Sequence, residues 1–298
     1  MPGSHIPPIT YDSAPRDGRN VFRDGFGALS DDEWCAVLGR SIAEPVIGGV
    51  RFPAFPNDDL QRHVHGSFGA NAMAEAFAFY SFVKANSYGA GPAPPGTRIL
   101  DFGAGWGRTL RPFMRDVEFA GLFGFEPDFL FCTLARALNP YAAFLTGGTT
   151  PAGDLPGGFF DVVFSWSVFS HLSPASAALW LQELARALAP GGTLVFTAWG
   201  ARFLHRLRDE AAARAAGQAV DWYSGICLDA AGSIEDRIQD YANGGLVWFT
   251  SGQSTVYGEA FVSEVALTRL LDEHRIPLAL VRSDTSALGQ DAFVLRRV

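Results

Sequence analysis

Short apolar runs alternate with longer segments of helical character through the middle of this chain. Each apolar run has the length of a strand; the runs are 98–102, 121–126, 142–146, 159–165 and 193–199. The segments between them are predicted helices, at 107–116, 127–139 and 173–190. Strands that alternate with helices over short links predict a parallel, doubly wound α/β sheet of the Rossmann-like kind.

Local signals mark the ends of the clearest predicted helix. Ser173 is a candidate N-cap, and Pro174 suits the first helical position, where its missing N–H is not needed. Leucines then recur at helical spacing over 181–188, and the Pro-Gly-Gly at 190–192 ends the helix. Pro127 is expected near the first turn of the preceding helix.

The chain before this alternation has a different character. Residues 1–27 are rich in Gly, Pro, Asp and Arg and predict an irregular arm, whereas Ser30 is a candidate N-cap for a helix that reaches Ile42. A second helix is predicted over 71–85. The breaker GAGPAPPG at 89–96 then marks the entrance to the main domain.

After residue 200 the alternation lapses and resumes only near the C-terminus. Helical patterns near 203–216 and 233–242 flank an aromatic segment, and this insertion is either extra scaffold or a substrate lid. A helix near 263–274 and strands over 278–284 and 291–298 follow, and the last strand is expected to be antiparallel. We predict an N-terminal arm and helical cap (1–95), a Rossmann-like core (96–200), an inserted helical and aromatic lid (201–258), and a C-terminal helix and strands that complete the sheet (259–298).

Composition excludes several classes of protein. The 298 residues are 48% hydrophobic and 18% charged, which favours a sizeable core over disorder. A net charge of −8 without any basic run disfavours nucleic acid as a partner. Cys35, Cys132 and Cys227 are too far apart for a zinc ribbon or a redox dithiol. No run reaches the ~20 apolar residues of a membrane span, and the N-terminus lacks a signal-peptide core, so we expect a cytoplasmic protein.

The most informative segment is DFGAGWG (101–107), between a predicted strand and a predicted helix. Glycines let the backbone turn tightly and approach a ligand, and the N-terminus of a following helix favours an anionic group. Glu126 ends the next strand, where a carboxylate can accept hydrogen bonds from both hydroxyls of a ribose. The spacing is GxGxG, with Arg108 in place of the third glycine of the dinucleotide fingerprint, and Asp101 precedes the first glycine. Both departures favour S-adenosylmethionine over NAD.

With these residues the chain resembles the class I S-adenosylmethionine-dependent methyltransferases. The blocks that carry the resemblance cover roughly residues 97–200, in the order that the family uses: DFGAGWG (101–107), GFEPD (124–128), LPGGFFDVVFSWSVFSHLSP (155–174) and LARALAPGGTLVFT (184–197). The resemblance implies a domain that binds S-adenosylmethionine. The SVFSHLS stretch is most similar to enzymes that methylate sugars and other small metabolites.

The resemblance also implies the cofactor contacts of the glycine loop. Gly103 and Gly105, with Ala104 between them, would line the methionine part of the cofactor. Asp101 would brace the loop from behind or reach the methionine ammonium through water. The loop would thus bind the amino-acid end of the cofactor.

Residues at other strand ends would bind the rest of the cofactor. By resemblance, Glu126 would hold the ribose hydroxyls, and Pro127 and Asp128 would lie beside the adenine. Ser165 ends the fourth strand, where backbone groups in this family meet the cofactor's ammonium. The residue that contacts the adenine amine stays open among Thr149, Thr150 and Asp154.

The reaction that the resemblance implies is an in-line displacement, for which the protein mainly positions the acceptor and excludes water. An alcohol or protonated amine must also lose a proton, which a histidine can accept near neutral pH. His171, a few residues after the fourth strand, is the candidate general base; the plainer alternative is a histidine that bonds backbone and shapes its turn. Trp166 and Tyr257 are the predicted members of an acceptor pocket. Glu259 could recognise a polar or cationic acceptor, but the simpler interpretation is an exposed acid.

Two further histidines, His63 and His65, precede the second predicted helix. A metal site of the facial type needs a third ligand at a definable place, and the sequence offers none, so no metal is predicted. In the resembling enzymes N-terminal helices cover the cofactor. We therefore expect these histidines to be structural or to cover the cofactor.

These observations predict a methyltransferase that uses S-adenosylmethionine and acts on a small-molecule acceptor. We expect O- or N-methylation in bacterial secondary or sugar metabolism. The alternative is a non-catalytic module that binds S-adenosylmethionine as a sensor or as a subunit of a complex. NAD-dependent oxidoreduction is disfavoured because the third glycine is missing. No feature of the sequence identifies the acceptor, the methylated atom or the oligomeric state.

Overall fold

The computed structural model describes residues 19–298, so most of the predicted N-terminal arm lies outside the described residues. The chain divides into two compact units, with the boundary between Thr146 and Gly147. This division does not test the four segments predicted from the sequence, which stay predictions.

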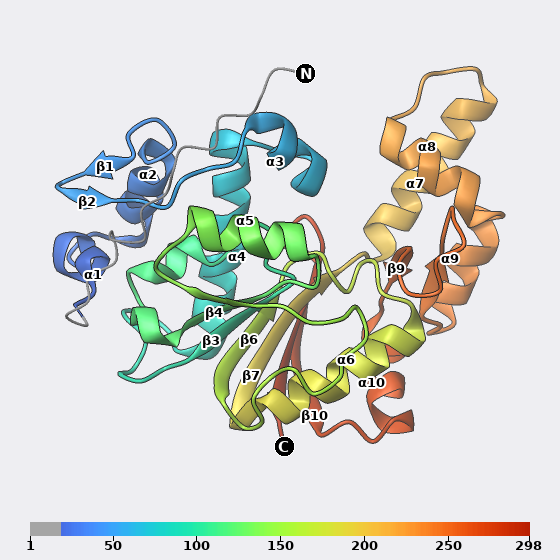
Figure 1. Cartoon of the computed structure of the whole chain (residues 1–298). Helices are drawn as coiled ribbons and strands as arrows, with labels where there is room; N and C mark the ends of the chain where they lie inside the picture. Colours follow the sequence, from blue (N-terminus) through green and yellow to red (C-terminus); the bar gives the residue numbers. More distant parts are fainter. Residues whose placement is uncertain (1–18) are drawn as a thin grey trace. The chain divides into compact units, whose positions relative to one another are not determined.

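The first unit contains helices, a short hairpin and parallel strands (Figure 1). Its 3₁₀ turns are named η. Its elements are α1 (Val21–Phe26), α2 (Asp31–Arg40), β1 (Val46–Ile47), β2 (Val50–Arg51), α3 (Asp58–His65), α4 (Gly69–Ser87), β3 (Ile99–Phe102), η2 (Arg111–Met114), η3 (Phe119–Gly121), β4 (Leu122–Phe125), α5 (Phe129–Leu138) and β5 (Ala143–Leu145). Strand β4 pairs in parallel with both β3 and β5. All four residues of β3 are buried, as expected of a parallel strand covered on both faces.

The helices near the start of the first unit follow from local capping. Ser30 caps α2, and its side chain and that of Glu33 satisfy each other's backbone N–H groups, so the predicted N-cap is confirmed. Residues 21–26 form α1, where an irregular arm was predicted. The reason is tertiary: the Asn20 side chain caps α1 and also donates to the carbonyl oxygens of Met114 and Val117, both at 2.9 Å.

The segment after β3 corrects a prediction. A helix was expected over 107–116, but the structure has turns there, followed by the short 3₁₀ element η2. Pro112 lacks a backbone N–H and crowds the preceding turn, so an α-helix cannot run through it. Arg111 is buried and donates to the carbonyl oxygens of Pro53 and Ala54 at 3.0 and 2.5 Å. A helix dipole therefore does not follow the glycine loop.

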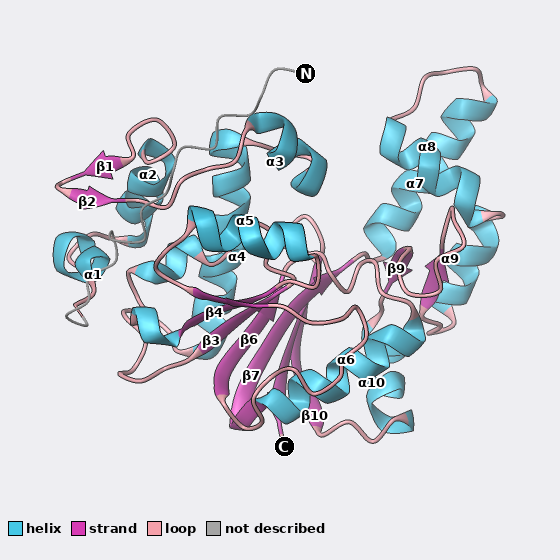
Figure 2. Cartoon of the chain, in the orientation of Figure 1, coloured by secondary structure: helices cyan, strands magenta, loops and turns pink. Residues whose placement is uncertain are grey.

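The second unit contains the remaining strands, α6 and the predicted insertion (Figure 2). Its elements are β6 (Phe160–Ser165), α6 (Pro174–Ala187), β7 (Leu188–Ala198), α7 (Ala201–Ala215), α8 (Trp222–Ala231), α9 (Ile234–Ala242), β8 (Val247–Phe249), β9 (Glu259–Phe261), α10 (Glu264–Glu273), β10 (Leu278–Asp284) and β11 (Asp291–Arg297). Ser173 caps α6 and Pro174 is its first residue, as predicted. Strands β6 and β7 are parallel, whereas β11 runs antiparallel to both β7 and β10.

The strands of the chain have the order β10-β11-β7-β6-β3-β4-β5 in a seven-stranded sheet. It is mostly parallel with an antiparallel last strand, which confirms the predicted Rossmann-like fold class. Over residues 19–298, none of the helices combines the length and the apolar character needed to cross a membrane.

The insertion has a core of its own. Helices α7, α8 and α9 lie side by side (yellow to orange in Figure 1). Buried residues of these helices and of β8 and β9 form one apolar cluster; they are Phe203, Leu204, Leu207, Cys227, Ala231, Ile234, Val247, Phe249 and Phe261. The helical patterns near 203–216 and 233–242 are confirmed by α7 and α9, whereas α8 and the antiparallel pair β8–β9 were not predicted.

Candidate functional site

The glycine loop after β3 has a backbone that only glycine adopts easily. Gly103, Gly105 and Gly107 have φ values of +78°, +53° and +81°. A side chain on Gly107 would lie 2.9 Å from the Phe144 ring, so this glycine is required for packing inside the unit. At Gly105 an added Cβ would make ordinary contacts, at 3.7 Å from Val64 and 3.9 Å from His65, so a small side chain meets no steric clash there.

The loop is tied to the end of β4. The N–H groups of Gly103 and Ala104 both donate to the carbonyl oxygen of Phe125, at 2.9 and 3.0 Å. The N–H of Gly105 donates to Glu126 Oε2 at 2.8 Å. These bonds bring the predicted glycines and the predicted ribose-binding acid together.

Glu126 is a buried carboxylate held by backbone donors. Its side chain receives the Gly105 N–H on Oε2 and the Asp128 N–H on Oε1, the latter at 2.9 Å, and the residue is 8% exposed. Burial raises its pKa, and the two backbone hydrogen bonds oppose that rise. Each oxygen keeps a second lone pair, so the carboxylate can still accept two hydroxyl donors. Asp128 itself is the N-cap of α5, which places Pro127 just before the helix and not within its first turn.

Asp101, the acid ahead of the first glycine, has one oxygen without a partner. Its Oδ2 accepts the Thr109 hydroxyl at 2.5 Å, whereas Oδ1 is buried and makes no hydrogen bond. Burial, and then the charge of nearby Glu126, raise the pKa of Asp101 to about 7. A buried acceptor without a donor is costly, and such groups call for a functional explanation. A cationic ligand group would supply the missing donor.

These features fit the nucleoside amino acid that the sequence predicts. Glu126 offers paired acceptors suited to ribose hydroxyls, and Asp101 offers an orphaned acceptor suited to an ammonium group. The backbone at Gly105 carries no side chain. The residues present therefore fit S-adenosylmethionine.

Helix α3 packs against this loop. Val64 Cγ1 and His65 Cε1 are the atoms nearest to the position that a Cβ on Gly105 would take. The His65 ring lies 5.7 Å from the ring of Trp106, and burial lowers its pKa to about 2, so it is neutral. His63 is exposed on the same helix. Within the part of the chain from residue 19 onward, no group of three or more His, Cys, Asp or Glu side chains could hold a metal ion.

In the second unit, the end of β6 carries a strained residue that sequence reasoning missed. Ser165 is fully buried and Trp166 is half-buried, and the next residue, Ser167, has a φ of +60°. Its N–H donates to Thr197 Oγ1 at 2.8 Å, and its hydroxyl accepts from the Gln290 side chain at 2.7 Å. A left-handed serine persists only when its surroundings hold it, and such strain is common at functional sites.

His171 is oriented by backbone. Its Nδ1 lies 2.9 Å from the carbonyl oxygen of Gly258, so Nδ1 donates to that oxygen, and in a neutral ring the lone pair is on Nε2. Its ring stacks on that of Tyr257, with centroids 4.7 Å apart and planes inclined by 12°. The hydrogen bond to the Gly258 carbonyl oxygen agrees with the alternative in which His171 only shapes its turn. The same bond leaves Nε2 available, which a general base at Nε2 requires. The predicted residues His171 and Tyr257 are therefore in contact.

Glu259 is not the exposed acid that the sequence suggests. Its side chain is 15% exposed, and its Oε2 accepts hydrogen bonds from Trp199 Nε1 at 3.0 Å and from the Tyr223 hydroxyl at 2.7 Å. The same oxygen lies 3.6 Å from His171 Nδ1. Only tertiary contacts bring these residues together, and the sequence carries no local signal for them.

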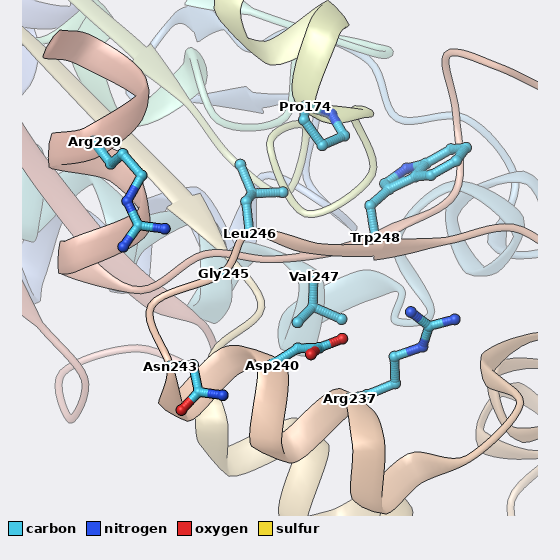
Figure 3. A pocket seen from close by; sticks show the side chains of 9 residues that line it. All are labelled: Pro174, Arg237, Asp240, Asn243, Gly245, Leu246, Val247, Trp248 and Arg269. Atoms are coloured by element: carbon cyan, nitrogen blue, oxygen red, sulfur yellow. The ribbon is translucent and has the colours of Figure 1, made fainter. Parts of the chain in front are cut away.

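A cavity of about 400 Å³ lies among α9, β8, α10 and the start of α6 (Figure 3). It contains none of the predicted site residues. Arg237 and Arg269 lie at opposite ends of it with Asp240 between them (Figure 3). Trp248, which also lines the cavity, donates its indole N–H to the carbonyl oxygen of His171 at 3.4 Å.

Comparison with known proteins gives a match to one protein family and to one curated enzyme. The family model of a methyltransferase domain matches residues 99–192. The enzyme 2-methyl-6-phytyl-1,4-hydroquinone methyltransferase of Synechocystis sp. is 33% identical over 147 residues, which are 47% of this chain and 45% of that protein. The match thus spans about half the length of that relative.

Two solved structures are similar to this chain, and the first of them shares its architecture. An amino pentose methyltransferase from Micromonospora echinaspora, with bound S-adenosylmethionine, superposes with a TM-score of 0.50 at 17% identity, over 82% of this chain and 98% of the other. An S-adenosylmethionine-dependent methyltransferase from Mesorhizobium loti has a TM-score of 0.46 at 18% identity, over 74% of this chain and 98% of the other. At such identity the amino pentose enzyme shows a shared fold and no more.

The matched segment contains the parts of the site that fit the cofactor. Asp101, the glycine loop and Glu126 all lie within residues 99–192, as does His171. S-adenosylmethionine is the cofactor of this kind of domain. The chain therefore carries a methyltransferase domain over residues 99–192.

Proposed function

We propose that this protein is an enzyme that transfers the methyl group of S-adenosylmethionine to a small-molecule acceptor by O- or N-methylation. The observation that carries the proposal is the arrangement of Asp101, Gly105 and Glu126. It presents one orphaned buried acceptor, a bare backbone turn and a fixed carboxylate within a single unit. This set is suited to the ammonium, the chain and the ribose of one ligand.

In this proposal the glycine loop binds the amino-acid end of the cofactor. Asp101 Oδ1 accepts from its ammonium group, and the backbone at Gly103, Ala104 and Gly105 lines its methionine chain. The bound cofactor supplies an electrophilic methyl group on a positively charged sulfur. The chain therefore needs no residue to activate the methyl donor.

The strand ends bind the nucleoside in the same proposal. Glu126 accepts the ribose hydroxyls with the lone pairs that its backbone donors leave free. Pro127 and Asp128 lie beside the adenine, and backbone groups at Ser165 contribute to the ammonium site. These roles come from the resemblance, and the geometry of Glu126 supports the first of them.

We propose that His171 Nε2 accepts the proton that the methyl acceptor loses. The Gly258 carbonyl oxygen holds the proton on Nδ1, so Nε2 is free to accept the O–H or N–H proton of the acceptor. Tyr257 stacks on the ring and fixes its plane. Trp166 and Tyr257 then contribute apolar surface to the acceptor pocket.

The class of acceptor is part of the proposal. The curated relative is named for a hydroquinone, and the superposed structure for an amino pentose; both names support a small molecule. The assignment to bacterial secondary or sugar metabolism, in the cytoplasm, rests on the resemblance of the SVFSHLS stretch. A non-catalytic module that binds S-adenosylmethionine is the competing function.

The test of this function has two parts. Titration calorimetry with S-adenosylhomocysteine and with NADH should give heat for the first ligand only. Transfer of label from methyl-labelled S-adenosylmethionine to a panel of small alcohols, phenols and amines should then identify acceptors. Binding without transfer to any acceptor would favour the non-catalytic module, and no binding would overturn both functions.

A matched pair of histidine variants tests the base. His171→Ala should lower kcat by about 10²- to 10⁴-fold, the usual contribution of a positioned general base, and leave the affinity for S-adenosylhomocysteine unchanged. His205→Ala, at an exposed histidine of α7, should leave both quantities unchanged. A kcat for His171→Ala within a factor of about two of the wild type would remove His171 from the mechanism.

A further inference from the structure

Glu259 is a largely buried carboxylate without a cationic partner. Within residues 19–298, no Lys or Arg nitrogen lies within ion-pair distance of it, and its one basic neighbour is His171 at 3.6 Å. That histidine already directs its Nδ1 proton to the Gly258 carbonyl oxygen at 2.9 Å. Carboxylates withdrawn from water are normally paired with a cation, because their desolvation is costly.

The carboxylate of Glu259 is held in one orientation. Trp199 Nε1 and the Tyr223 hydroxyl both donate to Oε2, whereas in the described part of the chain Oε1 accepts no hydrogen bond. Burial, followed by the charge of Glu259, raises the pKa of the Tyr223 hydroxyl, so this group stays protonated and remains a donor. One oxygen is therefore committed to the protein, and the other is available.

Backbone bonds fix the position of Glu259 beside the His171 loop. The N–H of Gly258 donates to the His171 carbonyl oxygen at 2.8 Å, and the N–H of Ala260 donates to the Ser170 carbonyl oxygen at 2.7 Å. Glu259 lies between these two bonds. Its carboxylate and the candidate base are thus carried by segments that cannot move independently.

Two aromatic side chains, those of Trp199 and Tyr223, contact this carboxylate. Trp199 packs on Phe203 with ring centroids 4.4 Å apart, and Tyr223 stacks on Phe203 at 6.0 Å. Tyr257, exposed to solvent, stacks on His171. A fixed carboxylate among aromatic rings suits a protonated amine, which gains both an ionic hydrogen bond and cation–π attraction.

We infer that Glu259 Oε1 binds a protonated amino group of the methyl acceptor, so that the acceptor is a small amine-bearing molecule. The inference rests on the proposed function. An ammonium that donates to Oε1 has no lone pair to receive a methyl group. The amine held by Glu259 is therefore a recognition group, and the methylated atom is another atom of the same acceptor.

The experiment uses probes that differ only in charge. Full-length protein saturated with S-adenosylhomocysteine is titrated with benzylamine and benzyl alcohol, and with cyclohexylamine and cyclohexanol. Each amine should bind at least about tenfold more tightly than its alcohol, as expected for a hydrogen bond to a charged group. Equal affinities within the pairs, or no binding of either amine, would overturn the inference.

Paired variants assign the preference to this side chain. Glu259→Gln keeps the shape and removes the charge, so it should abolish the preference for amines and leave the affinity for S-adenosylhomocysteine unchanged. Glu273→Gln, at an exposed acid of α10, should keep the wild-type preference. A preference that survives in Glu259→Gln would contradict the assignment. If Glu259→Gln does not fold, Tyr223→Phe removes one donor to Oε2 and should weaken amine binding while the cofactor affinity stays the same.

The outcomes separate this inference from the proposed function. Wild-type protein that fails to bind S-adenosylhomocysteine would overturn the proposed function, whatever the amines do. Wild-type protein that binds S-adenosylhomocysteine but does not distinguish amines from alcohols would overturn only the role of Glu259.

Discussion

Asp101 and Glu126 are both buried carboxylates, but they differ in the hydrogen bonds that they accept. Burial raises the pKa of both, but Glu126 receives two backbone N–H groups, whereas Asp101 receives one hydroxyl and keeps an orphaned oxygen. The pKa of Asp101 therefore reaches about 7. At the scale of single residues, the protein keeps the unpaired Asp101 Oδ1 at the place where the ammonium group of the proposed ligand would donate to it.

Replacing Asp101 by Asn should change how stability depends on pH. An acid whose pKa is higher in the fold than in the unfolded chain binds more protons when folded, so its stabilising contribution is present at low pH and is lost as pH rises. Between about pH 4 and pH 7, Asp101 should lower the free energy of unfolding by up to ~1.4 kcal/mol per pH unit. Urea denaturation at a series of pH values should show this slope in the wild type and its loss in Asp101→Asn.

The control for this prediction is Asp272→Asn, at an exposed aspartate of α10. It should keep the wild-type slope. A slope in Asp101→Asn equal to that of the wild type would mean that Asp101 titrates near its ordinary pKa.

Replacing Gly105 by Ala tests the bare backbone of the loop. Gly105 and Gly153 both have positive φ, so Ala should cost about 1–2 kcal/mol of stability at either position. Only Gly105 donates to Glu126 and faces α3, so only Gly105→Ala should weaken the binding of S-adenosylhomocysteine, by about tenfold or more (~1.4 kcal/mol). Calorimetry on both variants measures this difference. Equal affinities would remove the loop from the cofactor site.

At the scale of elements, a buried network of charges connects the helices of the first unit. Lys84 of α4, the single lysine of the chain, is 4% exposed and pairs with Asp31 of α2 and with Asp116, each at 3.0 Å. Arg115 pairs with the same two aspartates. The two positive and two negative charges balance, and the Tyr80 hydroxyl donates to Asp116 at 2.5 Å.

Removing one charge from this network should be far more costly than breaking a surface pair. Lys84→Met leaves Asp116 buried with too little positive charge, so it should lower the free energy of unfolding by about 3–5 kcal/mol. Arg40→Met breaks the exposed pair between Arg40 and Glu44 and should cost less than about 1 kcal/mol. Urea denaturation at pH 7 measures both values. Similar costs for the two variants would show that the network contributes no more than a surface ion pair.

At the scale of the whole molecule, a ligand that binds only the folded chain must stabilise it. S-adenosylhomocysteine at a hundred times its Kd should raise the free energy of unfolding by about 2.7 kcal/mol. NADH at the same concentration should leave the unfolding midpoint unchanged. Denaturation curves with and without each ligand provide the comparison, and stabilisation by NADH would reopen the dinucleotide hypothesis.

The sequence by itself determined the features that depend on interactions between residues close together in the chain. The short apolar runs from 98 to 199 indicated the strands, and Ser30, Ser173 and Pro174 marked helix starts, because caps and periodicity act within one or two turns. The glycine loop and the acid after β4 were recognisable for the same reason. Pro112 is also a local signal, because proline disrupts the interior of an α-helix. The prediction of a helix over 107–116 did not take it into account.

What only the tertiary structure decided depends on segments far apart in the chain. Residues 21–26 form a helix because Asn20 bonds to carbonyl oxygens near η2, and Asp101 is an orphaned acid because the fold buries it. Glu259 became a fixed, largely buried carboxylate through donors from Trp199 and Tyr223. A hydrogen bond between distant segments leaves no periodicity or spacing in the sequence, so no local pattern can predict it.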